Sequence, residues 1–133
     1  MKQRNIIAFI MLLFCAFFLV SCHSEEIILD KAESFYSDMK VEDGKVYIYC
    51  SLLIENKAEC EKNIALTAVL ADDAENGLLG EAEAWGYSLD LTSTAFCLGQ
   101  GENRLDVVFV GQHAGGDQKH DRLLPPIRIT ELS

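Results

Sequence analysis

The sequence predicts an all-β domain, an antiparallel β-sandwich of about seven strands that follows a cleaved, helical signal peptide. Apolar and polar side chains alternate along residues 45–55 and again along residues 104–110, which is the period of two that a half-buried strand requires. Short apolar segments recur every ~8–16 residues between turns, the spacing of sandwich domains. A length of 133 residues fits one domain of this kind.

The two alternating segments are the clearest predicted strands. Residues 42–44, Glu-Asp-Gly, form a turn before the first of them. In the second, Asp106, Val108 and Val110 are expected to face outward. The side chains expected to face inward in these two strands are Val46, Ile48, Cys50, Leu52, Ile54, Leu105, Val107 and Phe109.

The remaining strands are predicted from weaker patterns. Residues 63–71 favour a strand, although their Ala and Leu content leaves a helix open. Pro125 and Pro126 precede the last predicted strand, where a missing amide donor does least harm. The other predicted strands are residues 27–35, 81–87, 91–98 and 127–132.

Seven strands at this spacing resemble an immunoglobulin-like sandwich in pattern, with a small barrel as the alternative fold. The Cys–Trp–Cys spacing of antibody domains is absent, because Trp85 falls well downstream of the second strand. Beyond this pattern, residues 23–133 resemble no named family.

The N-terminal segment has the features of a secretory signal. Lys2 and Arg4 precede an uninterrupted apolar run from residue 6 to residue 20. A membrane-spanning helix needs about 20 apolar residues. This run is shorter, and its length is typical of the apolar core of a signal peptide.

Leu19-Val20-Ser21-Cys22 resembles the lipobox of bacterial lipoproteins. The resemblance implies that a signal peptidase cuts before Cys22 and that a diacylglycerol is attached to its thiol. It also implies an anchor on the extracytoplasmic face of a bacterial membrane, and His23 in place of Asp permits outer-membrane sorting in a Gram-negative cell. The chain then divides into a signal peptide (1–21), a short tether (22–26) and a β-sandwich domain (27–133).

Charge restricts the class of partner. The whole chain carries −10, and removing residues 1–21, with their two basic residues, leaves 9 basic and 21 acidic residues, or −12. Nucleic acid is excluded as a partner, because phosphate binding needs clustered Lys and Arg. We expect an envelope or surface protein as the partner, besides the membrane itself.

Three cysteines remain in the predicted domain. Cys50 is expected on the inward face as an inert thiol, and flanking carboxylates disfavour a thiolate at Cys60. Export permits a disulfide, either Cys60–Cys97 or Cys50–Cys60. We prefer the interpretation in which all three are reduced.

The longest polar stretch, residues 111–121, is the predicted contact site. It contains His113, Asp117, His120 and Asp121, and such a set could also ligate zinc in a metal-dependent hydrolase. The spacing matches no metal motif, and two adjacent glycines predict a mobile, solvated hairpin loop. We therefore predict a non-enzymatic binding module with no cofactor, and keep the hydrolase as the alternative.

Two weaker candidates complete the set. Residues 72–83 match a calcium-binding loop in part, but an acidic turn between strands is the simpler interpretation. The outward side chains of Tyr47 and Tyr49 could stack on a sugar or a partner, although cross-strand pairing explains them equally well.

Overall fold

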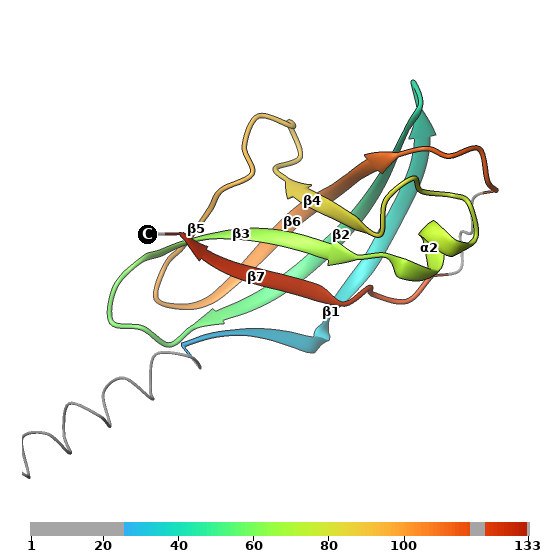
Figure 1. Cartoon of the computed structure of the whole chain (residues 1–133). Helices are drawn as coiled ribbons and strands as arrows, with labels where there is room; N and C mark the ends of the chain where they lie inside the picture. Colours follow the sequence, from blue (N-terminus) through green and yellow to red (C-terminus); the bar gives the residue numbers. More distant parts are fainter. Residues whose placement is uncertain (1–25, 118–121, 133) are drawn as a thin grey trace, which may run out of the picture.

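The computed structural model describes residues 26–117 and 122–132, and this part of the chain is almost entirely β-structure (Figure 1). All pairings between strands are antiparallel, which confirms the predicted fold class. No helix within the described residues is long and apolar enough to cross a membrane. The elements are β1 (Ile27–Glu42), β2 (Lys45–Asn56), β3 (Lys62–Val69), α2 (Ala71–Glu75), β4 (Glu83–Tyr87), β5 (Phe96–Leu98), β6 (Gly101–Gln112) and β7 (Ile127–Leu132).

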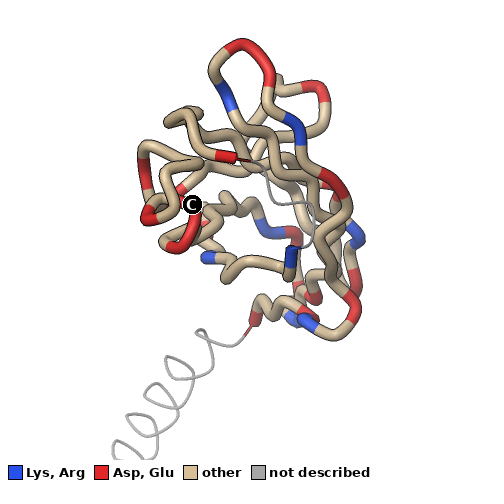
Figure 2. Tube along the Cα trace, turned by 90° about the vertical axis from the view of Figure 1, so that its right-hand side faces the viewer, with Lys and Arg blue, Asp and Glu red and all other residues tan. Residues whose placement is uncertain are grey.

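The strands form one seven-stranded sheet in the order β1-β2-β6-β4-β3-β5, with β7 paired to β3. The sheet folds over on itself, so that β3, β4 and β7 lie in front of β1, β2 and β6 in Figure 1. Turned by 90°, the strands surround a common interior, and acidic positions outnumber basic ones along the trace (Figure 2). The arrangement is sandwich-like.

The core lies between the two layers. All five predicted inward residues of β2 are at most 2% exposed. On β6, Val107 and Phe109 are fully buried, while Leu105 is half-buried and packs against the core. The turn between β1 and β2 places Asp43 and Gly44 at positive φ, which two-residue hairpins require.

The largest departures from the predicted strand bounds are in β1 and β5. β1 continues to Glu42, well past its predicted end at residue 35. Its register against β2 shifts between Asp30 and Phe35, and again between Tyr36 and Asp38. Each shift changes which side chains face inward and hides the alternation. β5 is shorter than predicted, because residues 88–93 form a turn through their own side chains.

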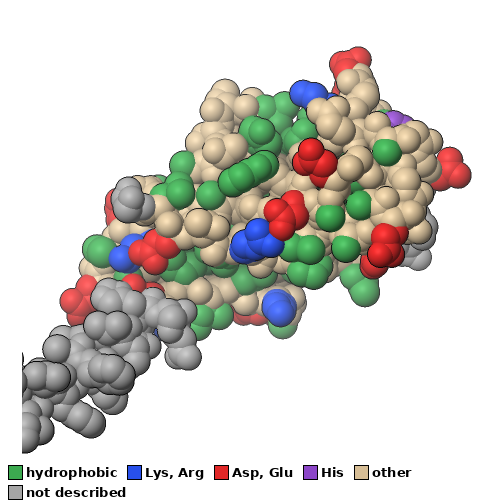
Figure 3. Space-filling view, in the orientation of Figure 1, with side chains coloured by type: hydrophobic (Ala, Val, Ile, Leu, Met, Phe, Trp, Pro, Cys, Tyr) green, Lys and Arg blue, Asp and Glu red, His purple; other side chains and the backbone are tan. Residues whose placement is uncertain are grey.

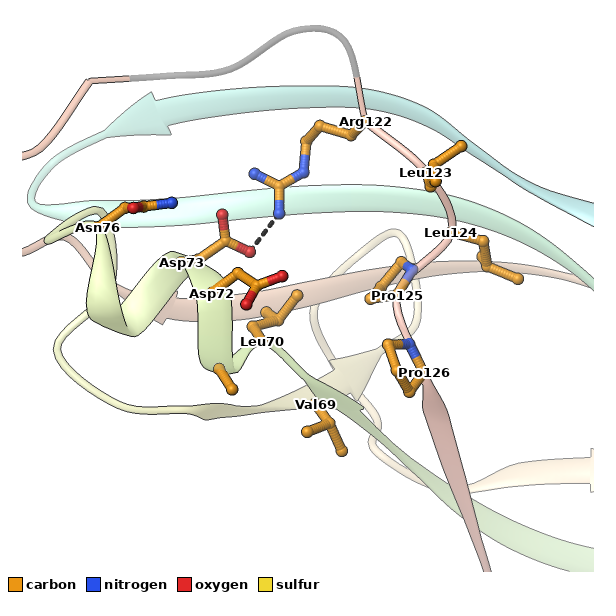
Figure 4. A pocket seen from close by; sticks show the side chains of 11 residues that line it. Val69, Leu70, Asp72, Asp73, Asn76, Arg122, Leu123, Leu124, Pro125 and Pro126 are labelled. Carbon is orange, nitrogen blue, oxygen red and sulfur yellow. Dashed lines mark hydrogen bonds and ion pairs between the residues drawn. The ribbon is translucent and has the colours of Figure 1, made fainter.

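The acidic segment after β3 is a short helix rather than a turn. Within α2, Asp73 is buried and forms an ion pair with Arg122 (Figure 4). Glu83, the last predicted calcium ligand, instead pairs with Arg128 of β7 at 2.6 Å. The two acidic side chains are therefore held by arginines on separate elements.

The connection from β6 to β7 is a crossover between layers. β7 pairs with β3 instead of β6, so the predicted hairpin between the last two strands is wrong. Arg122 anchors the end of this connection through its ion pair with Asp73, and the side chains of both residues are only 10% exposed. Leu123 is 91% exposed, and Pro125 and Pro126 then lead into β7 (Figure 4).

Candidate functional site

The predicted site residues fall partly outside the described residues. Cys22, His120 and Asp121 belong to that group, whereas His113 and Asp117 are described. His113 forms an isolated bridge with Leu79, and its Nε2 lies 2.9 Å from the carbonyl oxygen of Gly116, to which it donates. Asp117 is exposed.

Backbone contacts hold residues 113–116, the described part of the predicted loop before Asp117, against the segment after α2. The amides of Ala114 and Gly116 donate to the carbonyls of Leu78 and Gly77, at 2.9 and 2.8 Å. A Cβ at Gly116 would lie 2.6 Å from the carbonyl carbon of Gly77. Glycine at this position therefore permits a close approach of two backbones, which is a packing role.

The described residues contain no group of three or more His, Cys, Asp or Glu side chains that could hold a metal ion. Cys50, Cys60 and Cys97 are free thiols. Burial raises the pKa of Cys50 to about 12. Partial desolvation, followed by the Glu61 carboxylate, raises the pKa of Cys97. The neutral thiol is thus favoured at both positions, which makes them poor nucleophiles.

The most distinctive surface is the outer side of β2, β6 and β4. The register places Tyr47 beside Val110, and Val110 beside Trp85. One row further along, Tyr49 is beside Val108, and Val108 is beside Tyr87. Register partners, and residues two apart on one strand, share a face of the sheet. The chain's single Trp and three of its four Tyr therefore lie together on one outer face.

This surface, with Leu89 from the loop after β4, is called the aromatic face below. Trp85 is 58% exposed and Leu89 is 55% exposed, although both are large and apolar. Val108 lies between Tyr49 and Tyr87 on this face, as predicted for an outward side chain, but it is covered and 0% exposed. Figure 3 shows apolar side chains gathered over β4 and the loop that follows it. The face consists of Tyr47, Tyr49, Trp85, Tyr87, Leu89, Val108 and Val110.

Polar side chains hold the loop that carries Leu89. Asp90 accepts hydrogen bonds from the hydroxyls of Ser88 and Thr92, at 2.6 and 2.7 Å, and from the Thr92 amide. The next residue, Leu91, has φ +63 and is 47% exposed. Leucine is uncommon in this conformation. The hydrogen-bond network thus maintains two exposed leucines in one turn.

The same network predicts a pH dependence. The hydroxyls of Ser88 and Thr92 lower the pKa of Asp90 to about 2. Because the folded pKa is depressed, the stabilising contribution is complete above the unfolded pKa of about 3.9 and is lost as the pH falls through about 2. Replacing Ser88 with Ala should move the Asp90 pKa upward in an NMR titration, whereas Thr94→Ala should leave it in place. An unchanged pKa in Ser88→Ala would contradict this network.

Sequence reasoning identified Tyr47 and Tyr49 but missed Trp85, Tyr87 and Leu89. The available signal was an exposed-strand pattern in residues 83–87, in which Trp85 and Tyr87 alternate with small residues. Nothing in that local pattern indicates that β4 lies beside β6. No protein-family model, curated protein or solved structure matches the chain.

Proposed function

We propose that this chain is a bacterial lipoprotein, anchored through Cys22, whose β-sandwich-like domain is a non-catalytic interaction module. Its contact surface is the aromatic face, in place of the stretch 111–121. The lipobox at residues 19–22 supports the anchor. The observation that carries the interaction module is the gathering of Trp85 and three tyrosines on one outer sheet face.

Aromatic side chains support this function through the energetics of interfaces. Tyr and Trp are enriched among the few residues that supply most of a binding energy, because they bury a large area and lose little conformational entropy. Trp85 and Leu89 are each more than half exposed on one face, and exposed apolar side chains that gather in a patch mark interaction sites. The hydrogen bonds of Asp90 keep Leu89 in that position, which is a preorganised surface.

The short tether determines which end of the domain lies near the lipid. Only five residues, 22–26, separate the proposed anchor from β1, which limits the reach to about 17 Å. The start of β1 pairs with the end of β2, at Ile27 and Asn56. That end is rich in carboxylates, which anionic headgroups repel. The acidic residues near it are Glu26, Glu55, Glu59, Glu61 and Glu102.

The aromatic face is further from the anchor. Tyr49 lies six residues along β2 from Glu55, a separation of about 20 Å at ~3.3 Å per residue. A surface in this position is available to another protein of the envelope. For the aromatic face to contact the lipid, the domain would have to turn so that its acidic end points away from the membrane.

Site-specific photocrosslinking in cells tests the interaction module. A photoreactive residue at position 89 should crosslink to one defined partner, and Trp85→Ala should abolish that product. The same residue at position 130, on an exposed part of β7, should not crosslink to it. A product that survives Trp85→Ala would exclude the aromatic face as the contact surface.

The anchor makes a separate prediction. Cys22→Ala should move the protein out of the membrane fraction and abolish incorporation of labelled palmitate. Mass spectrometry of the native protein should find an N-terminus at Cys22 that carries acyl chains, since two chains anchor stably where one is marginal. An N-terminus at Met1 with an unmodified Cys22 thiol would refute the lipoprotein assignment.

A further inference from the structure

One edge of the aromatic face contains a cavity of about 250 Å³. Tyr49 and Leu89 form apolar walls, and Asp38 and Asp106 line it on either side. Asp38 is the register partner of Tyr49, and Asp106 faces outward one row away. Sites that enclose a small-molecule ligand usually measure ~300–1,000 Å³. This cavity is smaller and fits a single long side chain.

The two carboxylates have no cationic partner within the described residues. In this part of the chain, Asp38 accepts a hydrogen bond from the amide of Met39, at 2.8 Å, and neither Asp38 nor Asp106 forms an ion pair. Two basic side chains of the same face are engaged by groups other than these carboxylates. Lys40 pairs with Glu42 at 3.1 Å, lies over the ring of Tyr47 and also interacts with the hydroxyl of Tyr49. Arg104 donates to the carbonyl of Glu33 and to the hydroxyl of Ser51.

We infer that the aromatic face binds a cationic segment of a partner protein and that this cavity accepts one of its Lys or Arg side chains. The inference rests on the proposed function and names the chemistry of its partner. A guanidinium or ammonium group would stack on Tyr49 and pair with Asp38 and Asp106. Leu89 and Trp85 would cover the adjacent apolar part of the segment.

The negative charge of the aromatic face and of the whole chain disfavours other binding partners. A second copy of this chain would bring two unpaired carboxylates against two more, on molecules that each carry a large negative charge. An anionic lipid surface is repelled in the same way. A neutral sugar could stack on the aromatic rings, but it would not respond to the charge of Asp38 and Asp106.

A peptide pair tests the inference on the purified full chain in neutral detergent. The first peptide is acetyl-Gly-Arg-Leu-Arg-Gly-amide, and the second replaces both arginines with citrulline, which keeps the shape and removes the charge. Trp85 is the chain's only Trp, so its fluorescence reports on the face directly. We expect the arginine peptide to bind about fivefold or more tightly than the citrulline peptide. Raising the salt from about 50 to about 500 mM should remove that advantage.

Two matched double variants assign the effect to the cavity. Asp38→Asn with Asp106→Asn should bind both peptides equally. Glu55→Gln with Glu102→Gln makes the same change in charge at the other end of the same face and should keep the preference. Circular dichroism checks that both variants remain folded.

Equal binding of both peptides by the unaltered chain, or no binding of the arginine peptide, overturns the inference. An equal loss in both double variants overturns it as well. Each of these results leaves the photocrosslink from position 89 intact if the aromatic face binds an uncharged partner. A crosslink from position 89 that survives Trp85→Ala would instead refute the proposed function itself.

Discussion

Replacing Arg122 with Met should destabilise the protein by about 3 kcal/mol, the low end of the ~3–5 kcal/mol that follows from breaking a buried ion pair. The substitution leaves the Asp73 carboxylate buried without its cation, since both side chains are only 10% exposed. It also releases the end of the crossover that connects β6 to β7. Chemical denaturation should show a lower midpoint at an unchanged slope.

Two further variants test whether the loss of stability comes from the burial of this ion pair. Arg128 forms the same kind of pair with Glu83, but its side chain is 54% exposed, so Arg128→Met should cost less than ~1 kcal/mol. Adding Asp73→Leu to Arg122→Met should restore much of the stability, because the unpaired charge is removed with its partner. Equal losses for the two arginine variants would show that Asp73 and Arg122 are solvated in solution.

Replacing Phe109 with Ala should cost about 3–5 kcal/mol, the range for emptying a buried aromatic site. Phe109 is 0% exposed and heads the set of large, fully buried side chains. Its ring packs against β4, where a Cβ on Gly86 would approach it to 3.0 Å. Loss of the ring therefore removes contacts that hold β4 beside β6, and with them the arrangement of Trp85 and Tyr87.

A matched control for this change lies on β1. Phe35 is 54% exposed, so Phe35→Ala should change the free energy of unfolding by about 0.5 kcal/mol or less. Thermal and chemical denaturation measure both variants, and Trp85 fluorescence in the folded state reports any movement of β4. A loss below 1 kcal/mol for Phe109→Ala would mean that the two layers are packed more loosely than the structure indicates.

Local alternation made part of the fold predictable. β2 and β7 begin and end within one residue of their predicted bounds, because each has a continuous pattern and clear turn or proline signals beside it. Where the backbone departs from regular geometry, the prediction was wrong. The bulges in β1 and the hydrogen bonds of Asp90 after β4 both interrupt the period of two that defines a strand in the sequence.

The candidate site depended on contacts between distant residues. Trp85 on β4 is beside Val110 on β6, and Val110 is beside Tyr47 on β2, so three separate strands build the face. The sequence placed the contact site at residues 111–121, because this is the longest polar stretch and precedes the last predicted strand. In the structure, Gly116 allows close packing against Gly77, a contact that the local sequence does not indicate.

By itself, the sequence determined the all-β character of this protein, the inward faces of β2 and most of β6, and the acidic surface. Each of these depends on the order of side chains along one short segment, so local physics is sufficient. Only the tertiary structure decided which strands are neighbours. Register between separate strands follows from turns, bulges and core packing together, and that register brings Trp85, Tyr87 and the two outward tyrosines of β2 onto one face.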